Sequence, residues 1–418
     1  MSSITRAQLA SGLRVVTESL PSLRSVTVGA WVGSGARDET DGEWGASHFL
    51  EHLLFKGTET RTAGEIAEAV ESVGGEMNAF TTHEQTVFYV RVPDRELPLA
   101  IDILGDVLWR PAFRPDDIDA ERQVILEEIG MRDDTPDDLV HDVFAGALFP
   151  GHPLGREVLG GEDSITHMSR ATIAEYHGSH YQPKNAVLAA AGNLEHDQVV
   201  ALLEDKFPAH GTAVPTREHD DFPDAQRVVA VHRDTEQTHV VLGMRAIAAL
   251  DPDRYALTVL NQALGGGMSS RLFQKVREER GLAYSVYSYR AAYDDAGFLA
   301  IYAGTAPQRV AETLDVVQAE IARLIADGGL PARELAAAKG HLVGSLSMSL
   351  ETSASRMRRL GRSELVEGEV PELDDVVARV AAVDDDDIAR VIDRVIRGGT
   401  TLAAVGPHDE VELAGHLA

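Results

Sequence analysis

Alternation of apolar with small or polar residues predicts three strands in the first hundred residues. Residues 26–32 alternate in this way, and residues 77–82 and 86–92 are rich in β-branched and aromatic side chains. Strands place successive side chains on opposite faces of a sheet, which gives this period of two. The last two stretches are separated by three residues and stop at the Pro93-Asp94 turn, so we expect them to pair.

A helix is predicted between the first strand and this pair. Thr62 and Glu65 have the spacing of a capping box, in which each side chain binds a free backbone N–H of the first helical turn. Gly74 and Gly75 then stop the helix, because glycine is the usual residue just past a helix end. Between these signals the apolar residues recur on one helical face, at Ile66, Val70 and Val73.

The same order of elements occurs twice along the chain. Gly29 and Gly243 occupy matching apolar segments and are 214 residues apart, as are Gly192 and Gly406. A Pro-containing acidic stretch, residues 211–225, separates the halves and is typical of an exposed linker. We therefore predict an α+β fold of two homologous domains, residues 1–210 and 226–418, each an antiparallel sheet flanked by helices.

The charge of the chain excludes one class of partner. Asp and Glu outnumber Lys and Arg by 67 to 38, which gives a net charge of −29 and argues against nucleic-acid binding. The acidity favours solubility, and where it lines a binding site it attracts basic ligands. No apolar run is long enough to cross a membrane and no signal segment begins the chain, so we expect a cytoplasmic protein without membrane contact.

The chain contains no cysteine, so any metal site must use His, Asp or Glu. Residues 45–57 have the composition of a helix ended by Gly57, and they contain the order His48-x-x-Glu51-His52. At 100° per residue, Glu51 and His52 lie about 60° and about 40° to either side of His48, so all three share one face. The opposite face is apolar, formed by Phe49, Leu50, Leu53 and Leu54. This arrangement suits a divalent metal with an adjacent general base, and the order is the signature of the inverzincin zinc peptidases.

A hydrolytic zinc needs a third protein ligand and one open position. The segment of residues 119–129 offers Glu121, Glu127 and Glu128. Glu121 and Glu128 are seven residues apart and nearly aligned on one helix face, so one could bind metal while the other supports the site. Spacing alone does not choose among the three glutamates. His152, His177, His180 and His239 are each isolated, and we expect structural roles for them.

Four segments together resemble the pitrilysin, insulinase and mitochondrial processing peptidase family. They occur in the order HFLEHLLFKGT (48–58), GGEMNAFTTHEQTVFYV (74–90), ERQVILEEI (121–129) and HPLGREVLG (152–160). The resemblance extends over essentially the whole chain, at the length of one processing-peptidase subunit, a short bacterial type. It implies zinc ligands at His48, His52 and Glu128, with Glu51 as catalytic base. It also implies a helper carboxylate at Glu121 and a substrate-binding edge strand at Asn78 and Ala79.

The second half resembles the substrate-clamping part of the same family. Arg277 and Tyr284, seven residues apart, match its clamping pair, with Tyr284 as a donor to the developing oxyanion, and residues 265–273 match its glycine-rich loop. A phosphate-binding loop is excluded there, because the Gly-Lys-Ser/Thr ending is missing. By the repeat offset, the metal-binding positions correspond to residues that do not form such a site: Thr258, Asn261, Gln262 and about Gly344. One Zn²⁺ per chain is therefore expected.

The predicted function is that of a zinc metalloendopeptidase acting on peptides or unfolded segments. The alternative is an inactive family member that serves as a structural or peptide-binding subunit. Longer relatives join two such pairs of domains around a chamber, so we expect two copies of this chain to form a homodimer. In it, Arg277 and Tyr284 of one chain would complete the zinc site of the other; a heterodimer is the alternative assembly.

Overall fold

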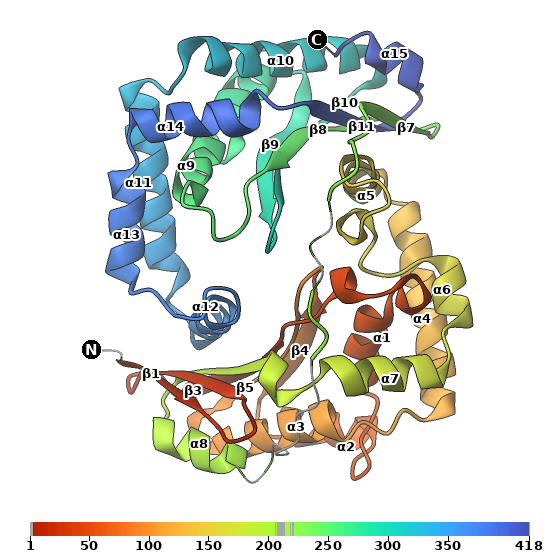
Figure 1. Ribbon diagram of the computed structural model, residues 1–418, viewed down its shortest axis with the longest axis vertical. Helices are drawn as coiled ribbons and strands as arrows, with labels where there is room; N and C mark the ends of the chain where they lie inside the picture. The colour runs from red at the N-terminus through yellow and green to blue at the C-terminus, as the bar shows by residue number, and fades with distance from the viewer. Residues whose placement is uncertain (1–2, 205, 207–213, 218, 220, 418) are drawn as a thin grey trace. The chain divides into compact units, whose positions relative to one another are not determined.

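The structure, a computed structural model, describes residues 3–204, 206, 214–217, 219 and 221–417. The chain forms two compact units, which Figure 1 shows with their element labels. The first unit comprises Met1–Gly130, Glu157–Glu218 and Ser349–Val370, and the second comprises Met131–Arg156, His219–Met348 and Pro371–Ala418. The predicted linker, residues 211–225, lies partly outside the described residues.

The first unit is built on a six-stranded sheet in the order β1-β2-β6-β3-β5-β4. Its strands are β1 (Ser3–Gln8), β2 (Arg14–Ser19), β3 (Ser25–Val32), β4 (Glu76–Thr81), β5 (Thr86–Pro93) and β6 (Ala186–Gly192). Strands β2 and β6 run parallel, whereas the other neighbours are antiparallel. Among the described strands, β4 pairs with β5 alone and forms an edge of the sheet.

Helices cover both faces of this sheet because its strands present apolar side chains on both sides. On one face the main core lies against α1 (Ala46–Leu53), α2 (Ala63–Glu71), α3 (Leu97–Trp109), α4 (Pro115–Asp133), α7 (Arg170–His180) and α8 (His196–Glu204). The short helix α6 (Glu162–His167) adds Ile165 to that core. On the other face, α12 (Ser353–Val366) packs over Trp31 and strands β2, β3 and β6.

The second unit repeats this plan with the strand order β7-β11-β8-β10-β9. Its strands are β7 (Val228–His232), β8 (Thr238–Ala246), β9 (Ala283–Ala292), β10 (Gly297–Thr305) and β11 (Thr400–Gly406). As in the first unit, one neighbouring pair, β7 and β11, is parallel. The predicted architecture of two related α+β units with helix-flanked, mainly antiparallel sheets is confirmed, and one neighbouring strand pair in each sheet is parallel.

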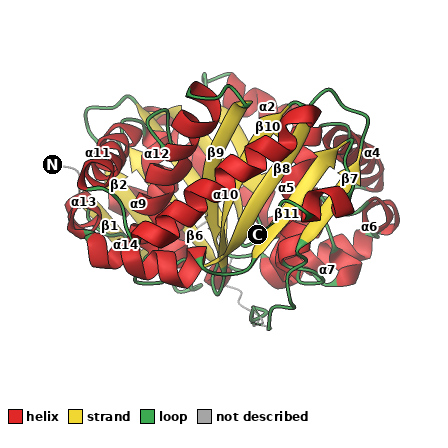
Figure 2. Ribbon diagram, turned by 90° about the horizontal axis from the view of Figure 1, so that it is seen from above, coloured by secondary structure: helices red, strands yellow, loops and turns green. Residues whose placement is uncertain are grey.

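Helices also cover both faces of the second sheet. On one face they are α9 (Arg254–Gly265), α10 (Val310–Asp327), α11 (Ala332–Ser349), α13 (Leu373–Ala382), α14 (Asp385–Val391) and α15 (Glu410–Ala414). Figure 2 shows α10 lying across the strands of this sheet. On the other face, α5 (Pro136–Leu148) packs Val140, Phe144 and Leu148 against β8, β10 and β11.

The two units do not coincide with the two halves of the sequence, because each half contributes one helical segment to the other unit. Helix α5 comes from the first half of the chain but belongs to the second unit, and α12 comes from the second half but belongs to the first. The repeated glycines mark where these helices press on their sheets. A Cβ at Gly29 would lie 2.4 Å from Met357 Sδ of α12, and one at Gly243 would lie 2.5 Å from Phe144 Cζ of α5. Each sheet therefore depends on a helix that the simple division at the linker assigns to the other domain.

The local signals located three predicted strands and the helix after Thr62 to within about two residues. Thr62 caps α2 through a complete capping box with Glu65, and the predicted strands coincide with β3, β4 and β5. The helix predicted to contain His48, Glu51 and His52 was expected to end at Gly57, and this end is wrong. Helix α1 stops at Leu53, and Gly57 forms a β-bridge with Thr62. Among the described residues, no helix combines the length and apolar character that crossing a membrane requires, and the cytoplasmic location stays a prediction.

Candidate metal centre

Helix α1 presents the metal-site residues because its other face is fixed in the core. Phe49, Leu50 and Leu53 are buried beneath it. The helix begins after Gly45, whose positive φ of 96° favours glycine, and where a Cβ would lie 2.6 Å from Ile165 Cδ1. As the helical periodicity predicts, His48, Glu51 and His52 remain on the opposite side.

The buried carboxyl group of Glu39 caps this helix. Glu39 Oε2 accepts the N–H of Gly45 and Oε1 accepts the N–H of Ser47, both at 2.7 Å. The bonds satisfy donors that the first helical turn leaves free. Burial nevertheless raises the pKa of Glu39 to about 8, against the opposing effect of the two N–H groups. No motif in the sequence identified Glu39, because its spacing from the helix reflects the path of the intervening loop.

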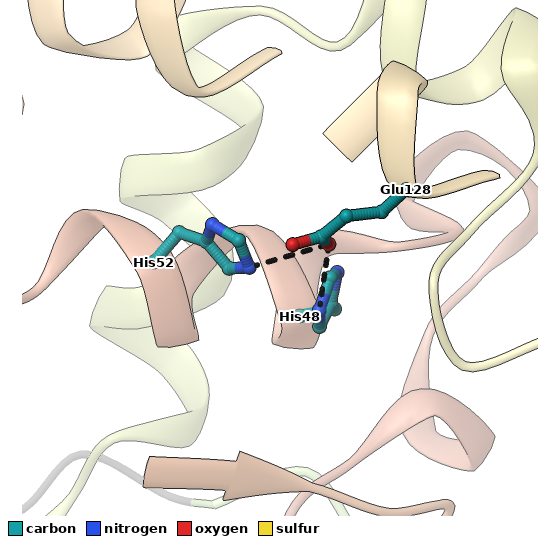
Figure 3. A group of neighbouring side chains, drawn as sticks. All are labelled: His48, His52 and Glu128. Carbon is teal, nitrogen blue, oxygen red and sulfur yellow. Dashed lines mark ion pairs between the residues drawn. The ribbon is translucent and has the colours of Figure 1, made fainter. Parts of the chain in front are cut away.

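Glu128 of α4 completes a group of three side chains that could hold a metal ion (Figure 3). Its Oε2 lies 3.7 Å from His48 Nε2 and 3.6 Å from His52 Nε2. One ligand atom from each residue lies within 4.8 Å of the other two. The structure thus brings together the three residues that the family resemblance implies as ligands.

The chemistry of these donors fits zinc. Burial, together with neighbouring His52, lowers the pKa of His48 to about 3, so its imidazole is neutral and keeps a lone pair for a metal. His48 Nε2 is the nitrogen that faces the group, at 3.7 Å from Glu128 Oε2, whereas the buried Nδ1 has no hydrogen-bond partner among the described residues. Two imidazoles and one carboxylate form a three-ligand set that leaves a coordination position open.

The structure gives the three candidate glutamates different positions relative to the imidazoles. Glu128 belongs to the metal-binding group, whereas Glu121 Oε2 lies 3.0 Å from His52 Nδ1. A carboxylate at Nδ1 favours the tautomer whose Nε2 is free to bind metal. The other oxygen of Glu121 lies 2.6 Å from Lys56 Nζ, and Glu127 is exposed outside the group. Sequence reasoning did not single out Lys56, although it lies only four residues after His52.

Glu51 lies beside the ligands without being one of them. Its Oε2 accepts a 2.7 Å hydrogen bond from Thr81 Oγ1 at the end of β4. Burial raises the pKa of Glu51, and the hydrogen bond from Thr81 opposes that rise. Thr81, which sequence reasoning missed, therefore orients the carboxylate that the motif places next to a metal.

Strand β4 offers a free edge beside α1. Asn78 and Ala79 lie within this strand, and Asn78 Oδ1 accepts the N–H of Ala79 at 2.8 Å. The side chain of Asn78 thus occupies a main-chain donor that an added strand would use. The contacts between α1 and β4 hold this edge next to the metal-binding helix.

Arg277 and Tyr284 lie together in the second unit. Arg277 belongs to a short π-helical segment, Phe273–Glu278, and Tyr284 lies at the start of β9. The Arg277 guanidinium is 4.6 Å from the centre of the Tyr284 ring, which stands 79% exposed. Their adjacency within this unit matches a pair that could act on one ligand.

The remaining histidines named above have structural partners. His177 Nε2 lies 2.8 Å from the carbonyl of Leu108, and burial lowers the pKa of His177 to about 4. His152 Nδ1 accepts the N–H of Leu154, and His239 Nδ1 lies 2.8 Å from the Tyr302 hydroxyl. His180 is buried and stacks on Tyr176. In the described part of the chain, none of the four joins a group of three metal-binding side chains.

Comparison with known proteins gives two family matches along the chain. Residues 14–162 match the model of the insulinase peptidases, peptidase family M16, and residues 167–342 match the model of the peptidase M16 inactive domain. The chain is 46% identical to an uncharacterized zinc protease of Streptomyces coelicolor, over 97% of this chain and 90% of that protein. It is 38% identical to an uncharacterized zinc protease of Bacillus subtilis, over 97% of this chain and 98% of that one.

A solved structure shares the fold. The crystal structure of a protease from Helicobacter pylori matches with a TM-score of 0.91 at 26% sequence identity. The match covers 97% of this chain and all of that chain. The metal-binding group lies in the part matched by the insulinase model, and Arg277 and Tyr284 lie in the part matched by the inactive-domain model.

Proposed function

The chain belongs to the insulinase family of peptidases, family M16, and we propose that it is a zinc-dependent endopeptidase acting on peptides or unfolded polypeptide segments. The observation that carries this proposal is the convergence of His48, His52 and Glu128 beside Glu51. An inactive scaffold would need neither the three-ligand set nor a base held next to it. The second half, matched by the inactive-domain model, would then contribute to substrate binding.

In this mechanism the ligand set and the base have separate tasks. His48, His52 and Glu128 would hold one zinc ion, which supplies Lewis acidity to activate water and to polarise the scissile carbonyl. Glu51 accepts the proton of the attacking water and then delivers it to the leaving amine. Thr81 keeps the carboxylate of Glu51 turned toward the site through its 2.7 Å hydrogen bond.

Strand β4 would align the substrate. An extended peptide adds to the free edge at Asn78 and Ala79 through main-chain hydrogen bonds, after the Asn78 side chain releases the N–H of Ala79. Such binding depends on the shape of the backbone, so we expect it to accept many sequences. It requires an extended chain, which is why the proposed substrates are peptides and unfolded segments.

The direct test measures metal content and peptide cleavage in the same preparation. We expect about one zinc per chain and hydrolysis of a quenched peptide library that a chelator abolishes. Glu128→Gln should weaken zinc binding, whereas Glu127→Gln, the neighbouring exposed glutamate, should not. Stoichiometric zinc without cleavage would instead favour the peptide-binding subunit, and the reverse result for the two glutamates would overturn the ligand assignment.

We further propose a homodimer whose two chains enclose the substrate. In it, each zinc site would be completed by Arg277 and Tyr284 of the partner, with Tyr284 donating to the developing oxyanion. A chain that carries both the ligand set and the clamping pair does not require a different partner, although a heterodimer is the alternative.

Mixing two inactive variants tests whether each zinc site uses Arg277 and Tyr284 of the partner chain. A Glu51→Gln chain and an Arg277→Ala/Tyr284→Phe chain should each be nearly inactive alone. After random subunit exchange, recovery of about a quarter of the wild-type activity is expected, because half of the dimers would contain one intact composite site. No recovery in verified mixed dimers would mean that the pair acts within its own chain.

A further inference from the structure

A lysine just beyond the end of α1 is linked to one of the metal-binding imidazoles through a single carboxylate. Lys56 Nζ lies 2.6 Å from Glu121 Oε1, and Glu121 Oε2 lies 3.0 Å from His52 Nδ1. The two oxygens of Glu121 are therefore divided between a cation and an imidazole. His52 Nε2, on the far side of the same ring, points toward Glu128 (Figure 3).

The carboxylate in the middle of this chain of contacts needs a charged partner. The Glu121 side chain is only 6% exposed, and a buried carboxylate is costly unless it is paired and hydrogen-bonded. Lys56 is 40% exposed, so its ammonium group keeps much of its hydration while it neutralises Glu121. The pair thus combines a buried acceptor with a cation whose desolvation cost is small.

Lys56 also decides which way Glu121 faces. With Oε1 held by Lys56 Nζ, Oε2 is the oxygen that remains for His52 Nδ1. An acceptor fixed at Nδ1 sets both the tautomer and the ring orientation of a metal-binding histidine. Without the lysine, Oε1 loses its cation and the carboxylate is free to rotate away from this arrangement.

We propose that Lys56 is a positioning residue of the metal centre, which acts through Glu121 to hold the His52 imidazole in its metal-binding orientation. This proposal depends on one part of the proposed function, namely that a metal binds at His48, His52 and Glu128; it does not depend on peptide cleavage. It extends the family resemblance, which implies a helper carboxylate at Glu121 and assigns nothing to the lysine.

The first unit offers a matched control. Lys206 Nζ pairs with Asp102 Oδ1, and the other oxygen of Asp102 lies 2.6 Å from Arg61. The Lys206 side chain is 37% exposed, nearly the same as that of Lys56. Its partner Asp102 is hydrogen-bonded to Lys206 and Arg61, and neither of these belongs to the metal-binding group. Lys206→Met therefore removes a lysine–carboxylate pair with a similarly exposed lysine, away from the metal-binding residues.

The experiment measures Zn²⁺ affinity by competition with a chromophoric chelator, using the full chain. We expect Lys56→Met to weaken zinc binding by about tenfold or more, the range observed when outer contacts of metal ligands are removed. Lys206→Met should bind zinc like the wild type, and Lys56→Arg should recover most of the loss because it keeps the cation and donor. Circular dichroism of each metal-free variant verifies that it is folded.

A double-mutant cycle tests the route of the effect. In a Glu121→Gln background, Lys56→Met should change zinc affinity little, because the contact through which it acts is already removed. An equal loss in both backgrounds, or an unchanged affinity of Lys56→Met, would overturn the role. A wild-type chain that binds no zinc would overturn the proposed function as well, whereas wild-type binding with an unaffected Lys56→Met would overturn this inference alone.

Discussion

Helices α1 and α9 occupy equivalent places in the two units but carry different chemistry. Each follows a central strand of its sheet, β3 or β8, and packs against the edge strand, β4 or β9. Each buries an apolar face, Phe49, Leu50 and Leu53 in α1 and Leu257, Leu260 and Leu264 in α9. By the repeat offset, however, the positions of His48, Glu51 and His52 correspond in α9 to Thr258, Asn261 and Gln262.

This difference shows that the fold and the site depend on opposite faces of one helix. The apolar face is enough to dock the helix, because α9 takes this place in the second unit without the metal-binding residues that α1 carries. The chemistry is added to the fold by a few side chains, and it cannot be inferred from the fold alone. Substitutions at corresponding positions in the two units test this separation.

The largest expected effect concerns the polar faces of the two helices. Glu51→Gln should keep its zinc but lower peptide hydrolysis by a factor of about 10²–10⁴, because it removes the general base and not a ligand. Thr258→Ala, on the corresponding face of α9, should leave turnover near the wild-type value, since Thr258 Oγ1 donates to the carbonyl of Arg254 within its own helix. Wild-type turnover in Glu51→Gln would refute the assigned role.

The repeated glycines provide a stability test of the exchanged helices. A Cβ at Gly243 would meet the Phe144 ring at 2.5 Å and the carbonyl oxygen of Leu299 at 2.8 Å, so Gly243→Ala should destabilise the second unit by about 1–3 kcal/mol. Gly29→Ala should cost less, because its nearest neighbour is the flexible Met357 side chain at 2.4 Å.

Two optical probes separate the units in this experiment. All three tryptophans, Trp31, Trp44 and Trp109, lie in the first unit, so their fluorescence reports its unfolding in urea, whereas circular dichroism reports both units. Gly243→Ala should shift the circular-dichroism transition with little change in the fluorescence transition. Equal shifts by both probes would show that the units unfold together.

The carboxylates at the starts of α1 and α9 predict opposite responses to pH. Burial raises the pKa of Glu39 to about 8, so its contribution to stability is present below the ordinary glutamate pKa and is lost as pH rises toward 8. Hydrogen bonds from Arg390 and Arg394 lower the pKa of Asp253, the residue before α9, so its contribution is present above the ordinary aspartate pKa and is lost on acidification.

Replacing the carboxyl group at either helix start should remove the part of the pH dependence of stability that this group causes. Glu39→Gln should flatten the decline of the urea midpoint between about pH 5 and pH 8 seen by tryptophan fluorescence. Asp253→Asn should flatten the acid decline seen by circular dichroism. Unchanged profiles in either variant would show that the carboxylate does not link that helix start to pH.

The smallest expected effect concerns the charge of the whole chain. If part of the net charge of −29 faces the substrate, Lys-rich peptides should be cleaved faster than matched Glu-rich peptides at low salt. Added salt should narrow the difference, because it screens interactions between separated charges. Equal rates at low salt would leave the acidity as a determinant of solubility alone.

The sequence by itself determined the features that depend on neighbours along the chain. Helical periodicity placed His48, Glu51 and His52 on one face, the capping box at Thr62 started α2, and the 214-residue repeat predicted two related units. These signals are readable because each depends on a spacing within one element, or on the order of elements. The helix end predicted at Gly57 was wrong because α1 already stops at Leu53, and Gly57 forms a β-bridge with nearby Thr62 instead of capping the helix.

Only the tertiary structure decided which side chains from separate elements meet. Spacing left Glu121, Glu127 and Glu128 open as ligands, and the packing of α4 against α1 turns Glu128 to the imidazoles and Glu121 to His52 Nδ1. The same packing joins Lys56 to Glu121, and the docking of α1 on β4 joins Thr81 to Glu51. The exchange of α5 and α12 between the units also leaves no local mark, because an amphipathic helix has the same pattern whichever sheet covers its apolar face.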